Sequence, residues 1–321
     1  MPDLFNFDQD LIAGFVDEFS RAVGTKGDLA FACIYRSADF PDDRQVFRVV
    51  IGDINYSLKS DRTGDQTGRL RDEYAVLRRL HDHFLQFETT RIIRPEYLSP
   101  SGLFFVTEYL DRPTATELIY ATPDNNQAAQ VYRRAGAWLH NLHAFKEQTS
   151  GEFWPQWMFE AIATLVHGTP KAAATSYAPM INMLKRQGEN LTQRHDTCGF
   201  AHGDFHGRNL LLGKGATYGI DFTEATEKHL IYDIVDFLKM DVFRPATPDD
   251  LDRSGILRVN KEMFLRQYHH PIDIDILDFC IRTRLLIDWL SITEEKYASS
   301  SFQRRKFDLL HGRLNQAMRI W

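Results

Sequence analysis

The sequence predicts an α+β fold with two lobes, a small antiparallel-sheet N-terminal lobe and a larger, mainly helical C-terminal lobe. Runs of β-branched and aromatic residues separated by turn residues fill the first third of the chain, and helical periodicity dominates the rest. The length of 321 residues suits one large two-lobed domain or two ordinary domains. A hydrophobic content of 43% is enough for a packed core, which excludes a mainly disordered chain.

The N-terminal lobe, residues 1–110, is expected to begin with an amphipathic helix. Asp8 is a suitable N-cap, apolar residues then recur three or four positions apart as far as Phe19, and Gly24 is placed to end the helix. The other elements are expected in this order: three antiparallel strands between residues 29 and 59, a helix over 66–84, and strands over 92–99 and 103–110.

The C-terminal lobe, residues 111–321, has helical periods over 131–145, 157–167, 277–292 and 307–318. One strand-like island interrupts them from Phe200 to Asp221, and it contains an abrupt cluster of His, Asp, Asn and Gly. We therefore expect the chemistry of the protein to depend on this island.

Composition and charge exclude several classes of protein. The 44 acidic and 38 basic residues give a net charge of −6, so no nucleic-acid partner is expected. The three cysteines are far apart, which favours free thiols in a reducing compartment. No run of about 18 uncharged apolar residues occurs, so no membrane span is expected. The acidic N-terminus is unlike a secretory signal, and we expect a cytoplasmic protein.

The central segment, AHGDFHGRNL, carries the residues best suited to catalysis. Asp204 and Asn209 are five positions apart and fit on one loop, with the carboxylate facing an acceptor hydroxyl and the amide oxygen facing a metal. Asp221, after a short apolar run, offers a second oxygen ligand. Oxygen ligands of this kind suit Mg²⁺ bound to nucleotide phosphates, so the pattern predicts phosphoryl transfer.

A cation for the phosphates is expected upstream. Lys59 ends the third strand and Glu73 lies in the following helix. A lysine held by a helix glutamate is fixed well enough to contact phosphates, whereas an unpaired surface lysine is mobile.

These segments resemble the aminoglycoside phosphotransferase and choline kinase-like family, which has a protein-kinase-like fold. The resemblance rests on HGDFHGRNLLL and GIDF, on LHNLHAF ahead of them, and on Lys59 and Glu73. It runs from about residue 29 to about residue 243. The family implies ATP and Mg²⁺ as cofactors and transfer of the γ-phosphate to a hydroxyl of a small molecule, such as an aminoglycoside, an amino alcohol or a sugar.

The resemblance also implies roles for residues of the C-terminal lobe. Asp204 would be the catalytic base or would orient the hydroxyl, and Asn209 and Asp221 would hold Mg²⁺. His202 would shape the catalytic loop, and Asp233 would brace that loop through its backbone amides.

In the N-terminal lobe the resemblance implies the nucleotide contacts. Lys59 would contact the α- and β-phosphates and Glu73 would position Lys59. Glu108, Tyr109 and Leu110 fall where the family's interlobe hinge receives the adenine through backbone groups. Because these residues and the catalytic loop are in different lobes, the whole chain is expected to act as one functional unit.

The turn between the first two strands departs from the family pattern. It reads SADFPDDRQ, from Ser37 to Gln45, and has three aspartates and no glycine. Three carboxylates beside a triphosphate would repel it by about 1 kcal/mol each. This turn keeps open the alternative of a nucleotide-binding pseudokinase that transfers no phosphate. Another alternative is a metal-dependent hydrolase whose ligands are His202, Asp204 and His206.

For the acceptor, the sequence offers two candidate features. Phe153, Trp154 and Trp157 form an aromatic cluster that would either stack on a substrate or pack between helices. Acidic residues crowd the region after the metal segment and would either welcome a cationic acceptor or form a solvated face: Asp236, Asp241, Asp249, Asp250 and Asp252.

Overall fold

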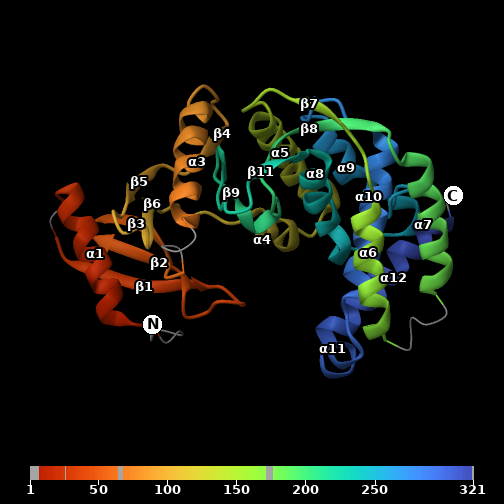
Figure 1. Cartoon of the computed structure of the whole chain (residues 1–321), viewed down its shortest axis with the longest axis horizontal. Helices are drawn as coiled ribbons and strands as arrows, with labels where there is room; N and C mark the ends of the chain where they lie inside the picture. Colours follow the sequence, from red (N-terminus) through yellow and green to blue (C-terminus); the bar gives the residue numbers. More distant parts are fainter. Residues whose placement is uncertain (1–6, 26, 64–67, 171–175, 320–321) are drawn as a thin grey trace. The chain divides into compact units, whose positions relative to one another are not determined.

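The computed structural model describes residues 7–25, 27–63, 68–170 and 176–319. The chain forms two compact units, and Figure 1 shows their elements. Unit 1 contains Met1–Arg112 and Leu211–Glu224, and unit 2 contains Pro113–Leu210 and Ala225–Trp321. Unit 1 is built on a small antiparallel sheet and unit 2 is mainly helical, which confirms the predicted fold class.

Unit 1 begins with α1 (Gln9–Val23), whose two ends are capped as predicted. The Asp8 side chain accepts a hydrogen bond from the Leu11 amide at 3.1 Å, and Gly24 ends the helix with a φ of 67°. The buried face of α1 packs on the sheet, and Phe15 stacks on Phe104 with ring centroids 4.6 Å apart. This contact is one part of the core of unit 1.

The main sheet of unit 1 is antiparallel throughout, and its strand order is β1-β2-β3-β6-β5. All five strands were predicted, and so was the helix that follows the first three. The predicted start of that helix at residue 66 lies outside the described residues. The bounds are β1 (Leu29–Arg36), β2 (Arg44–Ile51), β3 (Ile54–Asp61), α3 (Arg69–Phe84), β5 (Pro95–Leu98) and β6 (Phe104–Glu108).

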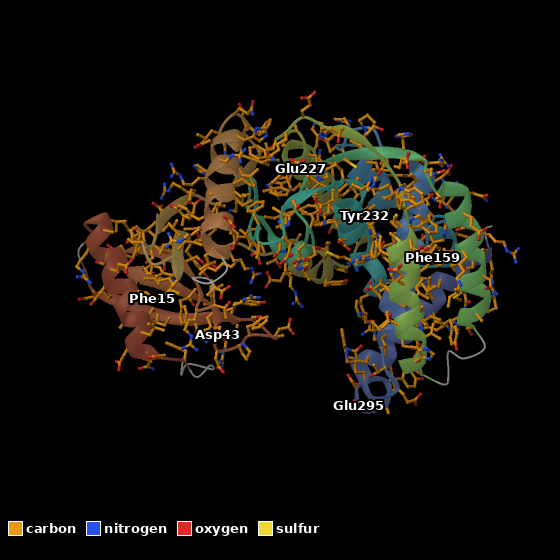
Figure 2. All side chains as sticks on the ribbon, viewed as in Figure 1. Phe15, Asp43, Phe159, Glu227, Tyr232 and Glu295 are labelled. Atoms are coloured by element: carbon orange, nitrogen blue, oxygen red, sulfur yellow. The ribbon has the colours of Figure 1, made fainter. Side chains whose placement is uncertain are left out.

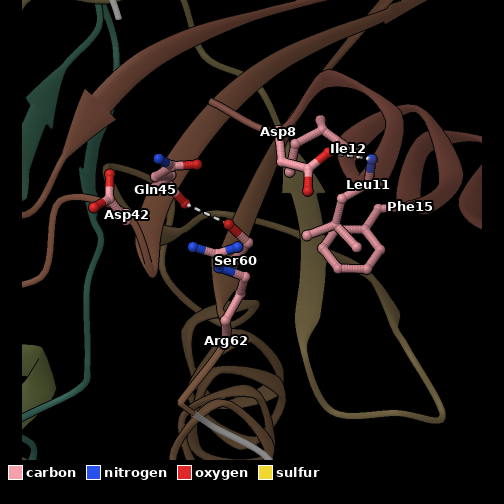
Figure 3. Close-up of a pocket in the computed structure, with 8 residues that line it drawn as sticks. All are labelled: Asp8, Leu11, Ile12, Phe15, Asp42, Gln45, Ser60 and Arg62. Carbon is pink, nitrogen blue, oxygen red and sulfur yellow. Dashed lines mark hydrogen bonds between the residues drawn. The ribbon is translucent and has the colours of Figure 1, made fainter. Parts of the chain in front are cut away.

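A small cavity lies where α1 meets β2 and β3 (Figure 3). Its volume is about 10 Å³, which is room for about one water molecule. In Figure 3 the Ser60 hydroxyl donates a hydrogen bond to the Gln45 carbonyl at 3.3 Å. The cavity is therefore a packing gap within unit 1 and is too small for a ligand.

A second sheet explains why Leu211–Glu224 belongs to unit 1. Its order is β4 (Thr90–Ile92), β10 (Thr217–Gly219), β9 (Leu210–Leu212), and β10 pairs in parallel with β4. The sequence division at residue 110 assigned this segment to the C-terminal lobe, whereas these pairings attach it to unit 1. Strands of three residues carry too little periodicity to be recognised, and a partner far along the chain stabilises them.

Unit 2 has an antiparallel sheet of order β11-β8-β7, from β7 (Thr149–Glu152), β8 (His195–Ala201) and β11 (Thr226–His229). The four helical periods predicted from the sequence are confirmed in α5, α6, α10 and α12. The helices are α4 (Ala115–Ala121), α5 (Asn125–His143), α6 (Gln156–Leu165), α7 (Tyr177–Leu191), α8 (Ile231–Leu238), α9 (Arg258–Leu265), α10 (Ile274–Leu290), α11 (Glu294–Ser299) and α12 (Ser301–Arg319), with 3-10 turns η1 (Val166–Gly168), η3 (Gly207–Asn209), η4 (Lys239–Phe243) and η5 (Pro248–Asp250).

Close packing in unit 2 supports the loop after β8. Gly136 lets α5 approach α9, since a Cβ there would lie 2.2 Å from the Phe264 carbonyl oxygen. Trp138 of α5 stacks on Phe205 with an interplanar angle of 11°, and Phe205 in turn stacks on Phe237 of α8. These rings anchor the loop to the core.

Among the helices of the described ranges, none combines the length and apolarity that crossing a bilayer demands.

Candidate functional site

Unit 1 brings Lys59, Glu73 and Asp221 together in one hydrogen-bonded group. Lys59 Nζ lies 2.8 Å from Glu73 Oε1 and 2.8 Å from Asp221 Oδ1. Lys59 also donates to the Thr223 hydroxyl at 3.0 Å. β3 supplies the lysine, α3 supplies the glutamate, and the turn after β10 supplies Asp221 and Thr223. The ammonium is therefore held at a fixed point by three acceptors.

Burial and charge set the protonation of this group. Burial by itself lowers the pKa of Lys59, but the negative charges of Glu73 and Asp221 outweigh it and raise the pKa above its ordinary value. Burial also raises the pKa of Glu73, whose side chain is only 4% exposed, although Lys59 opposes that shift. Lys59 is thus fully protonated at neutral pH and suited to bind phosphate oxygens.

Asp221 has an unusual backbone conformation. Its φ is 61°, in the left-handed region that few residues other than glycine adopt. Such a conformation costs about 1–3 kcal/mol and persists only where neighbouring contacts hold it. Its side chain is 45% exposed and its carboxylate contacts Lys59, so this turn presents a partly solvated carboxylate of the kind that binds a divalent cation.

The predicted hinge residues lie at the end of β6 and directly after it. The Glu108 amide donates to the Arg94 carbonyl and the Tyr109 amide donates to the Asn55 carbonyl. The Leu110 amide donates to no other described residue, and Leu110 is half-buried. Leu110 therefore has a backbone donor available for a planar heterocycle such as adenine.

The turn from Ser37 to Gln45 carries less unbalanced charge than its sequence suggests. Asp42 pairs with Arg36 at 2.7 Å, and Asp43, labelled in Figure 2, pairs with Arg62 at 3.2 Å. Two of the three aspartates are thus paired with arginines of the same unit. The repulsion expected from three unpaired carboxylates is reduced accordingly, and the main argument for a pseudokinase becomes weaker.

Unit 2 places Asp204 and Asn209 on one loop after β8. The Asn209 amide nitrogen donates to the Asp204 carbonyl at 2.9 Å and lies 3.3 Å from Asp204 Oδ2. The Asn209 amide oxygen accepts no hydrogen bond from another described residue, so it fits a metal ligand. His206 Nε2 lies 3.3 Å from Asp204 Oδ2. Burial by itself lowers the pKa of His206, but the Asp204 carboxylate outweighs burial and raises that pKa above its ordinary value.

Asp233 holds this loop from α8. Its carboxylate accepts hydrogen bonds from the backbone amides of His202 at 2.6 Å and Gly203 at 3.0 Å. Burial by itself raises the pKa of Asp233, but the hydrogen bond from His143 and nearby positive charge outweigh burial and lower it. The brace is therefore ionised at neutral pH, and both amides point at a charged acceptor. Asp233 and His202 are fully buried.

Two further residues support the loop. His143 Nε2 lies 3.1 Å from Asp233, and its Nδ1 lies 2.7 Å from the Tyr268 hydroxyl. Lys228 Nζ donates to the Gly203 carbonyl at 3.2 Å. The sequence already suggested that His143, on LHNLHAF, packs in the core or against a loop and binds no ligand, and its burial agrees with that expectation. Nothing in the sequence pointed to Lys228.

The hydrolase alternative needs three ligands that face one point. The His202 ring is instead buried against Trp138 and Phe205, and its Nδ1 accepts a hydrogen bond from the Asp204 amide at 3.4 Å. Across the residues that the structure describes, no three His, Cys, Asp or Glu side chains are grouped so as to hold a metal ion. The donor arrangement therefore does not support a His/Asp metal triad.

The aromatic cluster divides into two kinds of side chain. Phe153 is fully buried and packs edge-on against Phe279, so it belongs to the core. Trp154 and Trp157 are 49% and 39% exposed. Trp157 Nε1 donates to the hydroxyl of Tyr232, which is labelled in Figure 2, at 3.1 Å. Only the two tryptophans remain available to a ligand.

The acidic residues after the metal segment mostly have partners in the chain itself. Asp236 pairs with Arg284 at 2.8 Å, Asp241 is buried beside Arg313, and Asp252 pairs with Lys261 at 2.7 Å. Asp250 caps a 3-10 turn, and Asp249 is exposed. Most of this charge is therefore neutralised or structural, which weakens the case for a cationic acceptor.

Solved structures identify the class of fold. A spectinomycin phosphotransferase, in complex with ADP and spectinomycin, is 14% identical (95% of this chain, 97% of that chain, TM-score 0.61). A choline kinase from Streptococcus pneumoniae is 15% identical (97% and 98%, TM-score 0.57), and an amicoumacin kinase in complex with AMP-PNP and Ca²⁺ is 16% identical (96% and 93%, TM-score 0.58). The fold is that of the protein-kinase-like phosphotransferases.

The sequence itself identifies the family. The model of the phosphotransferase enzyme family matches residues 42–259, which is more than half of the chain. The chain therefore belongs to the phosphotransferase enzyme family, as its motifs suggested. No curated protein sequence matches it.

Proposed function

We propose that this chain is a small-molecule kinase that transfers the γ-phosphate of ATP, with Mg²⁺, to a hydroxyl group. The observation that carries the proposal is the group formed by Lys59, Glu73 and Asp221. It joins a permanently charged lysine to a buried carboxylate and to a partly exposed carboxylate. That is the arrangement needed to bind phosphates and a divalent cation together.

In this proposal the residues of unit 1 bind and orient the nucleotide. Lys59 donates to phosphate oxygens while Glu73 holds its position, and the Leu110 amide donates to the adenine. Asp221 would supply an oxygen ligand to Mg²⁺, which when bound neutralises phosphate charge; the metal-ligand role expected for Asn209 belongs to unit 2. Catalysis then comes mainly from positioning and charge neutralisation.

The residues of unit 2 act on the acceptor. Asp204 accepts or orients the proton of the acceptor hydroxyl, and Asn209 and His206 hold its carboxylate in place. Asp233 keeps the loop in one conformation through two backbone amides. Aminoglycosides, amino alcohols and sugars are the acceptor classes proposed, and the pairing of the acidic residues gives no preference for the most cationic of them.

The decisive experiment is the substitution Asp204→Asn in an assay of ATP consumption across alcohol acceptors sorted by charge. We expect kcat to fall by at least about 100-fold, because a general base contributes about 10²–10⁴-fold. The nucleotide Kd should stay within about twofold, since Asp204 acts on the acceptor. Asp249→Asn, an exposed substitution in the same unit, is the control. Full activity in Asp204→Asn would overturn the assignment.

A further inference from the structure

We infer that Thr223 is a positioning residue, whose hydroxyl fixes the Asp221 carboxylate against Lys59 and Glu73. The inference rests on the proposed function and adds a residue that the motif does not require. Thr223 stands two positions after Asp221, in the turn that follows β10. All four residues lie in unit 1.

The contacts of the Thr223 hydroxyl carry the inference. Its oxygen lies 3.0 Å from Lys59 Nζ, 2.6 Å from Asp221 Oδ1 and 3.1 Å from Glu73 Oε2. It is thus a neutral group that touches all three charged groups. A side chain that only filled space would not place a polar atom within hydrogen-bond distance of each.

The hydroxyl chemistry determines which bonds form. Lys59 has only donors, so the Thr223 oxygen accepts from it. The hydroxyl has a single proton, and the 2.6 Å distance to Asp221 favours that carboxylate over Glu73 at 3.1 Å. Thr223 therefore connects the ammonium to the Asp221 carboxylate as an acceptor on one side and a donor on the other.

The setting of Asp221 gives this connection a role. Its backbone is in the left-handed region at a φ of 61°, and its side chain is 45% exposed, so hydrogen bonds contribute to the position of the carboxylate as well as packing. Glu73 also repels it, since both carboxylates share one ammonium. The Thr223 hydroxyl offsets this repulsion and orients the oxygen that lies nearest to Lys59.

The test compares Thr223→Val, which keeps the shape and removes the hydroxyl, with Thr223→Ser, which keeps the hydroxyl. Thr63→Val is the matched control, because that hydroxyl also donates to a carboxylate in unit 1, Asp61, at 2.6 Å. Circular dichroism checks folding, and Thr223→Ala replaces Thr223→Val if the valine variant does not fold.

The first readout uses the protein without nucleotide. ¹⁵N-edited NMR follows the proton exchange of the Lys59 ammonium, which its three acceptors are expected to slow. The variant Lys59→Arg serves to assign the signal. We expect exchange about 10-fold faster in Thr223→Val, because one hydrogen bond to a charged group is lost, and unchanged exchange in Thr223→Ser and Thr63→Val. Equal exchange in wild type and Thr223→Val overturns the inference, whether or not the chain is a kinase.

The second readout is kinetic. We expect kcat/KM for ATP to be about 10- to 100-fold lower in Thr223→Val, the range for one hydrogen bond to a charged group, and close to wild type in Thr223→Ser. KM for the acceptor should change by less than about twofold. An equal loss of activity in Thr223→Ser would overturn the inference, because the loss would then not come from removal of the hydroxyl. A wild type that transfers no phosphate would refute the proposed function and leave the NMR comparison decisive for Thr223.

Discussion

Asp233 gives the sharpest prediction for the loop that carries Asp204. The substitution Asp233→Asn keeps the shape but turns one carboxylate oxygen into an NH₂ group. Because both oxygens accept backbone amides, at 2.6 Å from His202 and 3.0 Å from Gly203, the new donor faces a donor. One hydrogen bond to a charged acceptor is lost and a buried N–H is left unpaired, each worth about 1–3 kcal/mol. We expect the free energy of unfolding to fall by about 2–6 kcal/mol.

Tryptophan fluorescence in urea measures this loss within unit 2, because every tryptophan among the described residues lies in that unit. The control is Asp236→Asn on the same helix, which pairs with Arg284 but binds no amide of the loop; a loss of about 1 kcal/mol or less is expected there. An unfolding midpoint of Asp233→Asn equal to that of wild type, or a loss no larger than in the control, contradicts the reasoning.

The same carboxylate gives a dependence on pH. The pKa of Asp233 is lower in the folded protein than its ordinary value of 3.8, so the unfolded chain binds the proton more readily. Its contribution to stability is therefore complete above about pH 4 and is lost as pH falls through the folded pKa. Wild type should lose stability below pH 4 more steeply than Asp233→Asn, which has no proton to bind.

Two further predictions concern other groups. Burial and neighbouring histidines lower the pKa of His140 from 6.5 to about 4, so the unfolded chain binds the proton first and the protein should lose stability as pH drops from 6.5 toward 4. The difference between the melting temperatures at pH 7 and pH 5 should therefore become smaller in His140→Asn. It should stay as in wild type in the exposed control His167→Asn. Glu73→Gln should raise KM for ATP about 10-fold, because it weakens the contact that positions Lys59. The control Asp72→Asn, at an exposed neighbour on the same helix, should change KM by less than about twofold. Equal effects of the two substitutions would contradict the pairing of Lys59 with Glu73.

Much of the fold could be predicted because its signals are local. The apolar spacing after Asp8 and the left-handed Gly24 fixed the bounds of α1, and alternating runs fixed the strands of the main sheet. The strands β4, β9 and β10 could not be predicted individually, since three residues give no period and their stability comes from pairing across the chain.

The candidate site also has features that local sequence spacing predicts and features that depend on contacts between distant residues. Asp204 and Asn209 are five positions apart, so one loop brings them together and the sequence alone was enough to connect them. The partners of the acidic residues could not be predicted in this way. Asp236 and Asp252 looked available to a cationic acceptor, but each is paired with a basic residue of the chain that the sequence did not point to.

The sequence by itself determined the class of fold, the family and the residue types of the catalytic loop, because each depends on short-range spacing. Only the tertiary structure decided which distant groups meet. Lys59 and Asp221 are 162 positions apart, and their contact depends on how β3, α3 and the turn after β10 pack in unit 1. Thr223 illustrates the difference: it is an ordinary residue in the sequence, and becomes the neutral link between three charges only when that packing brings them within hydrogen-bond distance.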